Sequence, residues 1–398
     1  MSSKFNFDEI VDRRGTTAEK WNINEGELPM WVADMDFKAA PVVIETMQEI
    51  VNHGIFGYDF VPKSFYESVQ NWLKRKHNVD VETWEIIYTD GVIPAIRSSM
   101  RALANEGDGV VMFTPTYNNF YTSIFYNNLE LIDCPLDYKA GEYTINWDNL
   151  EEALSKDENK IFLFCNPQNP IGMNYNLDDL ERIAKLCKKH NVYMFCDEIH
   201  ADLIHPGEEH FSASNIALDA QDNLLVFNSV TKSFNLAGMK AAYVICRNQE
   251  LKAKLERRFE QDKAMEINSF GVKVTEACYS KEGEEWLDAL NEYLAENRKL
   301  LETRLTEAFP DLIFSKANAT YLAWINTSNY AQDSKHMADF MRFKTGLFVQ
   351  AGEIYGQTGY KFIRWNYACP REMLEDGINR FIESLKEYQE LGISYVMD

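Results

Sequence analysis

Short apolar runs that alternate with helical segments constrain the fold of this chain more than any other feature. Each run has the length and apolar character of a buried strand, and the runs cover residues 110–113, 131–134, 161–165, 192–196, 224–228 and 243–246. Between two of them, residues 178–190 place Leu180, Ile183, Ala184 and Cys187 on one helical face. This alternation predicts an α/β fold, in which a mainly parallel sheet carries helices on both faces.

The length of the chain predicts two structural parts. A chain of 398 residues is too long for one average domain. Residues 284–309 form a long amphipathic pattern that predicts a linking helix, and residues 1–50 form an irregular arm rich in Trp and Asp. We therefore expect a large domain at residues 51–284, and a smaller α+β domain made of residues 1–50 and 285–398.

Charge and cysteine content limit the partners and the compartment. The net charge of −22 argues against nucleic acid and against anionic membranes as partners. No apolar run approaches the length of a membrane span, and the N-terminus has no apolar signal core. The 7 cysteines are scattered without a Cys-x-x-Cys pair, which is typical of a reducing compartment. We expect a cytoplasmic protein.

Lys232 is the first candidate for chemistry. It follows the apolar run at residues 224–227 and lies in a Ser-, Thr- and Gly-containing loop, so it is expected just past a strand end. Ligands of α/β proteins bind at such strand ends. A lysine there can form a Schiff base with an aldehyde cofactor, and neighbouring hydroxyl groups suit a phosphate.

Three further segments lie at similar positions. Residues 166–172 (Asn-Pro-Gln-Asn-Pro-Ile-Gly) and residues 196–202 (Cys-Asp-Glu-Ile-His-Ala-Asp) each follow an apolar run. Residues 89–95 contain a Gly turn that opens a helix, whose N-terminal amides can hold a phosphate. Together with Lys232, these segments predict one ligand site at the edge of the sheet.

This set of motifs resembles the fold-type I pyridoxal-phosphate enzymes of the class I/II aminotransferase superfamily. The chain is more closely similar to the MalY/PatB-type cystathionine beta-lyases, or C–S lyases, and the resemblance covers nearly its whole length. It is carried by residues 6–14, 30–37, 54–58, 233–238 and 368–371, in addition to the strand-end motifs. The resemblance implies a pyridoxal-phosphate-dependent transferase fold and the cofactor pyridoxal 5'-phosphate.

The resemblance also assigns residues to the cofactor ring. Lys232 matches the lysine that anchors the cofactor and transfers protons, and Asp197 matches the acid that keeps the pyridine nitrogen protonated. Tyr117 matches the aromatic residue that stacks on the ring, so these three residues form the expected catalytic set. Asn169 matches the partner of the phenolic oxygen, and His200 stands where many relatives have a tyrosine that touches the same oxygen.

The cofactor phosphate is expected at the start of the helix after residue 91. The backbone amides of Gly91, Val92 and Ile93 would bind it there. Ser229 and Lys240 match side chains that add contacts to the phosphate. Many class I aminotransferases carry an arginine at the Lys240 position, and a lysine supplies one charge without a bidentate fork.

The resemblance further implies a homodimer with shared active sites. Tyr58, in the run Phe56-Gly57-Tyr58, matches a tyrosine that reaches the phosphate across the subunit interface. Each site would then contain residues of two chains.

The substrate would be a small amino acid. Arg364 matches the arginine that binds the substrate α-carboxylate, for which a bidentate guanidinium is suited. Tyr121 lies one helical turn after the stacking tyrosine and is a second candidate for contact with the ring and substrate. Residues 31–37 and Tyr355 are expected to line the pocket, without assigned roles.

We therefore expect a pyridoxal-phosphate-dependent C–S beta-lyase that converts cystathionine or a cysteine-type substrate to a thiol, pyruvate and ammonia. In this reaction Lys232 removes the Cα proton and a thiolate leaves Cβ. One alternative is a class I/II aminotransferase, which would use the same residues with a 2-oxo acid acceptor. The other is a regulatory binding protein that retains the fold.

A metal site is the competing interpretation of one segment. His200, His205 and His210 lie five residues apart, among several carboxylates, and zinc sites use such residues. That spacing does not align side chains on a helix, and Pro206 and Gly207 interrupt the segment. We expect no metal.

Overall fold

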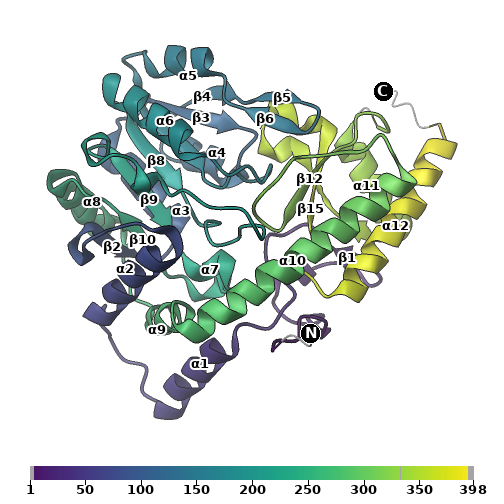
Figure 1. Cartoon of the computed structure of the whole chain (residues 1–398), viewed down its shortest axis with the longest axis horizontal. Coiled ribbons are helices and arrows are strands. Elements are labelled where there is room, and N and C mark those ends of the chain that lie inside the picture. Colours follow the sequence, from purple (N-terminus) through teal and green to yellow (C-terminus); the bar gives the residue numbers. More distant parts are fainter. Residues whose placement is uncertain (1–3, 332, 393–398) are drawn as a thin grey trace.

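A seven-stranded sheet forms the centre of the computed structural model, which describes residues 4–331 and 333–392 (Figure 1). The strands follow the order β2, β10, β9, β8, β7, β3, β4, with bounds Ile86–Thr89, Ala242–Ile245, Leu224–Asn228, Tyr193–Asp197, Asn159–Cys165, Gly109–Thr114 and Glu130–Pro135. Neighbouring strands are parallel, except that β10 is antiparallel to both β2 and β9. The predicted α/β fold with a mainly parallel sheet is therefore confirmed.

Helices cover both faces of this sheet, which explains why its central strands are apolar throughout. Along β7, Ile161 and Leu163 belong to one buried cluster, and Phe162 and Phe164 belong to another, as the alternation of side chains along a strand requires. The first cluster includes residues of α3 (Val92–Leu103), α4 (Asn118–Phe125) and α8 (Gln249–Asp262). The second includes residues of α2 (Lys63–His77), α5 (Trp147–Leu154), α6 (Leu177–Lys189) and α9 (Ser269–Cys278).

A second, antiparallel sheet lies towards the C-terminus. Its order is β11, β12, β15, β14, with bounds Ile313–Phe314, Leu322–Asn326, Phe362–Asn366 and Gln350–Ala351. Helices α11 (Ser334–Thr345) and α12 (Arg371–Glu390) lie beside it. Helix α10 (Lys281–Ala308) runs from α9 towards this sheet (Figure 1) and matches the predicted linking helix. The division into residues 51–284, and 1–50 with 285–398, stays a prediction.

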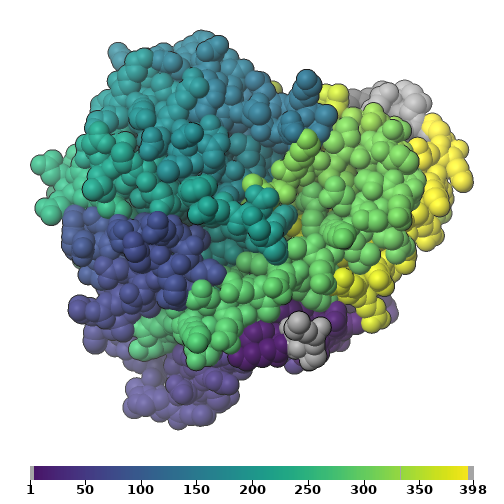
Figure 2. Space-filling model, in the orientation of Figure 1, coloured from purple at the N-terminus to yellow at the C-terminus, as the bar shows by residue number. Residues whose placement is uncertain are grey.

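The N-terminal residues contribute to a separate two-stranded sheet rather than to either of the larger sheets. Strand β1 (Leu28–Pro29) pairs in parallel with β13 (Leu347–Phe348). Helix α1 (Pro41–His53) follows and lies at the lower edge of the molecule, where the surrounding segment projects (Figure 2). The remaining elements are the hairpin β5 (Asp137–Lys139) and β6 (Glu142–Thr144), the short helix α7 (Val230–Ser233), and 3-10 turns at Glu19–Trp21, Thr83–Glu85, Ala213–Asn215, Leu218–Ala220, Ala237–Met239, Gly352–Tyr355 and Gln357–Lys361.

None of the helices in the described residues combines the length and the apolar character needed to cross a membrane.

Candidate active site

Three neighbouring strands of the large sheet bring the main candidates together. Asp197 ends β8, directly between Cys165 of β7 and Phe227 of β9 in the strand register. Asn169 follows β7, and Lys232 follows β9 in the one-turn helix α7. The carboxyl ends of adjacent parallel strands meet at one edge, where ligands bind in α/β folds. The sheet therefore places the predicted residues in one site.

Asp197 is a buried carboxylate without a charged partner in direct contact. It is 3% exposed, and the backbone N–H of Ile199 donates to its Oδ1 over 3.1 Å. No side chain among residues 4–331 and 333–392 donates a hydrogen bond to it. The pKa of Asp197 is raised to about 7, chiefly by burial and to a lesser extent by the charge of Glu198. The hydrogen bond from Ile199 and the charge of Lys232 oppose this rise. The site thus offers a carboxyl group that a bound cation would ionise.

Lys232 reaches across the site to the N-terminal arm. Its Nζ donates to the carbonyl of Ala33 over 2.6 Å. Burial and the charge of Arg364 lower the pKa of Lys232, and Asp34 and Asp197 partly oppose them, so that the pKa is about 8. A lysine with such a pKa has a usable fraction of free amine near neutral pH, as a nucleophile or general base requires.

Arg364 enters the same site from the second sheet. It lies on β15 and is 5% exposed. One guanidinium nitrogen donates to the carbonyl of Trp31 over 2.7 Å and another to Oδ1 of Asn169 over 3.4 Å. The guanidinium carbon lies 4.8 Å from the ring centroid of Tyr355. Tyr355 therefore supports Arg364 from one face, a contact that sequence reasoning left unassigned.

The aromatic candidates differ in their surroundings. Tyr117 immediately precedes α4, and its hydroxyl accepts a hydrogen bond from Nδ2 of Asn119 over 2.6 Å. Burial raises the pKa of Tyr117, while Asn119 and the charge of Arg364 oppose the rise, so its hydroxyl lies in the field of the site. Tyr121 instead donates to the backbone carbonyl of Tyr355 over 3.0 Å, which gives it a part in holding the site together.

His200 belongs to the site as a neutral imidazole. Burial, together with the positive charges of Lys232 and Arg364, lowers its pKa to about 3. Its Nδ1 is buried and has no hydrogen-bond partner among the described residues. The two other histidines of the competing metal interpretation form hydrogen bonds with residues outside this site. His205 contacts Tyr367, and His210 contacts Asn174. In the described part of the chain, no group of three or more His, Cys, Asp or Glu side chains could hold a metal ion.

Gly91, Val92 and Ile93, three of the predicted phosphate residues, form the start of α3. Gly91 precedes the helix with an extended backbone, so the first-turn amides of Val92 and Ile93 lack acceptors within the helix. Burial raises the pKa of the adjacent Asp90, and the charge of Lys240 opposes that rise, which places Lys240 beside this turn. Ser229 donates its hydroxyl to the carbonyl of Ala241 over 2.6 Å, so a phosphate would compete with that bond.

Tyr58 lies apart from the other candidates. It is fully exposed, in an extended segment between α1 and α2. Within one chain it therefore makes no contribution to the site.

Residues 31–37 form a wall of the site through their backbone carbonyls. Asn366, two residues after Arg364 on β15, donates from its Nδ2 to the carbonyls of Val32 and Asp34, each over 2.6 Å. The backbone N–H of Asn366 donates to the carbonyl of Met30, the residue directly before this segment. The second sheet thus fixes the path of the arm past the strand ends of the first sheet.

Two further residues that hold the arm were missed from the sequence. Tyr321 donates to the carbonyl of Ala33 over 2.9 Å. Asn235 accepts from the N–H of Met35 over 2.9 Å and donates to the carbonyls of Met35 and Phe37. Asn235 belongs to a motif that carried the resemblance, and Asn366 lies two residues after Arg364, but no sequence pattern pointed to Tyr321.

A buried charge cluster fixes the arm from its other side. Lys20 is fully buried, and its Nζ lies 2.6 Å from Oδ2 of Asp36. Arg13 pairs with Asp34 and Asp36, each over 2.8 Å, and Trp21 donates to Asp36. Because Lys20 and Asp36 are paired away from water, with Arg13 and Asp34 half-buried beside them, the cluster restrains residues 34–36.

A family model covers most of the chain. The model described as aminotransferase class I and II matches residues 26–381. The chain belongs to the class I and II aminotransferase family. The predicted membership of this superfamily is therefore confirmed.

The most similar relatives include named lyases. The chain is 33% identical to cystathionine beta-lyase PatB of Bacillus subtilis (strain 168), over 96% of this chain and 100% of that protein. The resemblance to the MalY/PatB-type cystathionine beta-lyases is confirmed by this match.

Solved structures agree with the fold. A PLP-bound putative aminotransferase from Clostridium difficile 630 is 34% identical, with a TM-score of 0.92, over 96% of this chain and 100% of that chain. A PLP-bound C–S lyase from Staphylococcus hominis is 29% identical, with a TM-score of 0.90, over 96% of this chain and 99% of that chain. Pyridoxal phosphate is bound to the protein in both of those structures.

Proposed function

We propose that this protein is a pyridoxal-phosphate-dependent C–S beta-lyase that acts on cystathionine or a cysteine-type amino acid. One observation carries the proposal. The same buried site contains Lys232, whose pKa is lowered, and Asp197, which has no cationic partner in direct contact. The likeness to a cystathionine beta-lyase over its whole length supports elimination as the reaction. The overall reaction breaks the Cβ–S bond, consumes one water and yields a thiol, pyruvate and ammonia.

The residues present fit pyridoxal phosphate. Asp197 would pair with the ring nitrogen, which accounts for a buried carboxyl group that lacks a charged partner in the described chain. Asn169 and His200 would reach the phenolic oxygen, Tyr117 would cover one face of the ring, and the start of α3 would hold the phosphate. When bound, the cofactor supplies an electron sink for the pair released at the substrate Cα.

The protein side chains would supply binding and proton transfer. Arg364 would bind the substrate α-carboxylate with its planar fork, oriented by the ring of Tyr355. Lys232 Nζ would take the Cα proton, for which its lowered pKa suits it. The arm at residues 31–37 would close one side of the site and exclude water, because Asn366 and Asn235 hold it against the strand ends.

The test is the number of turnovers without an acceptor. With cystathionine and no added oxo acid, the protein is expected to release pyruvate and ammonia continuously, well beyond one equivalent per site. A lactate dehydrogenase-coupled assay measures the pyruvate, and the Lys232→Ala variant is the blank. Cysteine and alanine serve as comparison substrates, because alanine lacks a leaving group at Cβ.

An aminotransferase is the second candidate, favoured by the likeness to the putative aminotransferase from Clostridium difficile. An aminotransferase would convert about one equivalent of the amino acid per site to its oxo acid, without releasing ammonia, and then stop. Conversion would resume when 2-oxoglutarate or pyruvate is added as the acceptor. That result would overturn the lyase proposal. Absence of turnover with every amino acid would instead favour a regulatory binding protein.

The proposed enzyme is a homodimer with shared active sites. The segment that carries Tyr58 also exposes Ile55, Phe56 and Phe60, an unusual set of large apolar side chains to leave in water. A partner subunit that covered this segment would bring Tyr58 to the second site. Mixing inactive Lys232→Ala chains with impaired Tyr58→Phe chains is then expected to restore activity, since one hybrid site is intact. No recovery would mean that each site lies within one chain.

A cytoplasmic location completes the proposal. All of the cysteines are free and buried, including Cys165 and Cys196 beside the site, as suits a reducing compartment. Cell fractionation with an antibody to the protein tests this point.

A further inference from the structure

We infer that Asp202 and Ser233 are positioning residues that set the orientation of Lys232. The bond between them joins the turn after β8 to the helix that carries the lysine. This inference rests on the proposed role of Lys232, and it adds two residues that do not touch the cofactor or substrate themselves.

Asp202 is a buried acceptor for donors from two helices. Its Oδ1 accepts from Nε1 of Trp72 over 3.0 Å and from Nε2 of His77 over 2.8 Å, both on α2. Its Oδ2 accepts from Oγ of Ser233 on α7 over 3.0 Å. Burial alone would raise the pKa of Asp202, but the bonds from His77, Trp72 and Ser233 outweigh it and hold the pKa below its usual value. The carboxylate therefore stays ionised as a strong acceptor.

Helix α7 needs such an external contact. It spans only Val230–Ser233, and a single turn of helix has little stability of its own. Asn235 fixes the chain just after the turn against the arm, on the side of the substrate. The side chain of Ser233 is the corresponding contact on the opposite side, directly adjacent to Lys232 in sequence. Removal of this bond would leave the lysine free to tilt with its helix.

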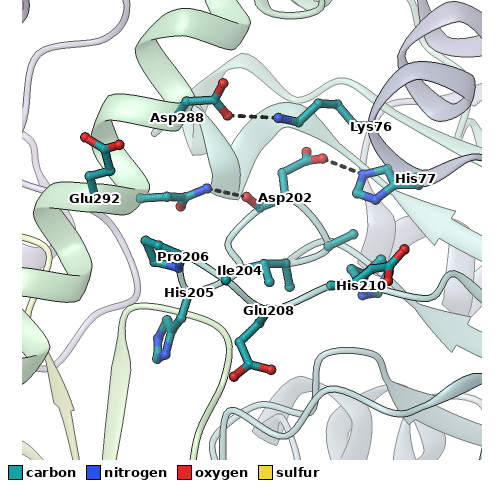
Figure 3. A pocket seen from close by; sticks show the side chains of 14 residues that line it. Lys76, His77, Asp202, Ile204, His205, Pro206, Glu208, His210, Asp288 and Glu292 are labelled. Atoms are coloured by element: carbon teal, nitrogen blue, oxygen red, sulfur yellow. Dashed lines mark hydrogen bonds and ion pairs between the residues drawn. The ribbon is translucent and has the colours of Figure 1, made fainter.

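Asp202 is itself held in place by its surroundings. Figure 3 shows the ring of His77 pointing at its carboxylate. Asn291 of α10 donates from its Nδ2 to the backbone carbonyl of Asp202 over 2.9 Å. Nearby, Lys76 of α2 pairs with Asp288 of α10 over 2.8 Å and joins the two helices. Asp202 thus ties α7 to a frame made of α2 and α10.

The test removes one hydroxyl and compares two readouts. Ser233→Ala is expected to lower kcat roughly ten- to hundredfold with little change in KM, because the binding of substrate by Arg364 is unaffected. The same variant, stripped of cofactor, is expected to couple Lys232 to added pyridoxal phosphate several times more slowly, as followed by absorbance. Ser384→Ala is the matched control: it removes a buried hydroxyl on α12 that bonds only to its own helix.

A second variant separates positioning from loss of stability. Asp202→Asn keeps an acceptor oxygen, and the double variant with Ser233→Ala is expected to be no slower than the slower single variant, because both act through one bond. Ser233→Ala with wild-type kcat and coupling rate would overturn the inference. A lower Tm with both rates unchanged would do the same. If the wild-type protein forms no pyruvate while Ser233→Ala still couples slowly, the lyase proposal fails and the positioning role stands.

Discussion

The active site combines two regions that are held by different physics. The strand-end residues Asn169, Asp197 and Lys232 take their places from a seven-stranded sheet whose central strands are buried on both faces. The arm at residues 31–37 has almost no regular structure and is held by charges and side-chain hydrogen bonds. The sheet therefore gives the reacting groups fixed positions, while the arm depends on a small number of polar contacts.

The two regions also respond to pH with opposite sign. Asp197, at a strand end, has a raised pKa because it is buried without a charged partner. Glu27, directly before strand β1, has its pKa lowered to about 2, chiefly by the hydrogen bond from Arg342. Ionisation of Asp197 therefore destabilises the folded, cofactor-free protein, whereas ionisation of Glu27 stabilises it.

The largest expected effect is at the sheet. Lys232→Ala is expected to reduce turnover on the order of 10⁴-fold or more, because it removes the general base of the proposed reaction. The fold should be unaffected, since the arm at Ala33 is the one hydrogen-bond partner of the lysine side chain among residues 4–331 and 333–392. Pyruvate release measures the loss. Borohydride reduction of the wild-type protein, followed by peptide mass spectrometry, should label Lys232; a label on Lys240 would contradict the assignment.

The next effect is at the arm and concerns stability. Lys20→Met is expected to lower the free energy of unfolding by about 1.5–3 kcal/mol, because the buried carboxylate of Asp36 loses its lysine but keeps Arg13 and Trp21. Urea titration measures the change. Lys38→Met is the control: its exposed ion pair with Glu9 lies near the same arm and should contribute less than about 1 kcal/mol. Equal effects of the two variants would show that the charge cluster does not hold the arm.

A smaller effect on rate, together with a pH signature, is expected at Asp197. Asp197→Asn should slow turnover on the order of 10²-fold, since a neutral amide does not favour a protonated ring nitrogen. In the cofactor-free wild-type protein, the stability from protonated Asp197 is complete below its usual pKa of 3.8 and is lost as the pH rises through about 7. The variant should lack this loss in thermal melts between pH 4 and 8. A near-normal rate would mean that another acid serves the ring.

The smallest expected effect is on stability, at Glu27, which lies directly before β1 and ahead of the arm. The stability from ionised Glu27 is present above its usual pKa of 4.5 and is lost as the pH falls towards about 2. Glu27→Gln should therefore be less stable than the wild type near pH 7 and should converge with it as the pH is lowered. Thermal melts of both proteins across this range measure the difference. A constant difference would show that Arg342 does not act through the charge of Glu27.

The sequence predicted the sheet region well for a local reason. Buried strands require continuous apolar runs, and residues that follow such runs must meet at the edge of a parallel sheet. Lys232, Asp197 and Asn169 were therefore placed correctly from their positions after three such runs, although their roles stay predictions. Strand β2 was not predicted, and the antiparallel direction of β10 was not either, because neither strand direction nor neighbour order is encoded in a local pattern.

The arm shows what only the tertiary structure decided. Asn366 contacts Val32 across 334 residues of chain, and Asn235 contacts Met35 across 200. No periodicity connects such positions, and the single residues involved resemble any other polar residue in the sequence. By itself, the sequence determined which residues could react, because burial and strand ends leave a repeated local signature. The folded structure decided what surrounds them, because hydrogen bonds and ion pairs between distant residues depend on the final arrangement of the two sheets.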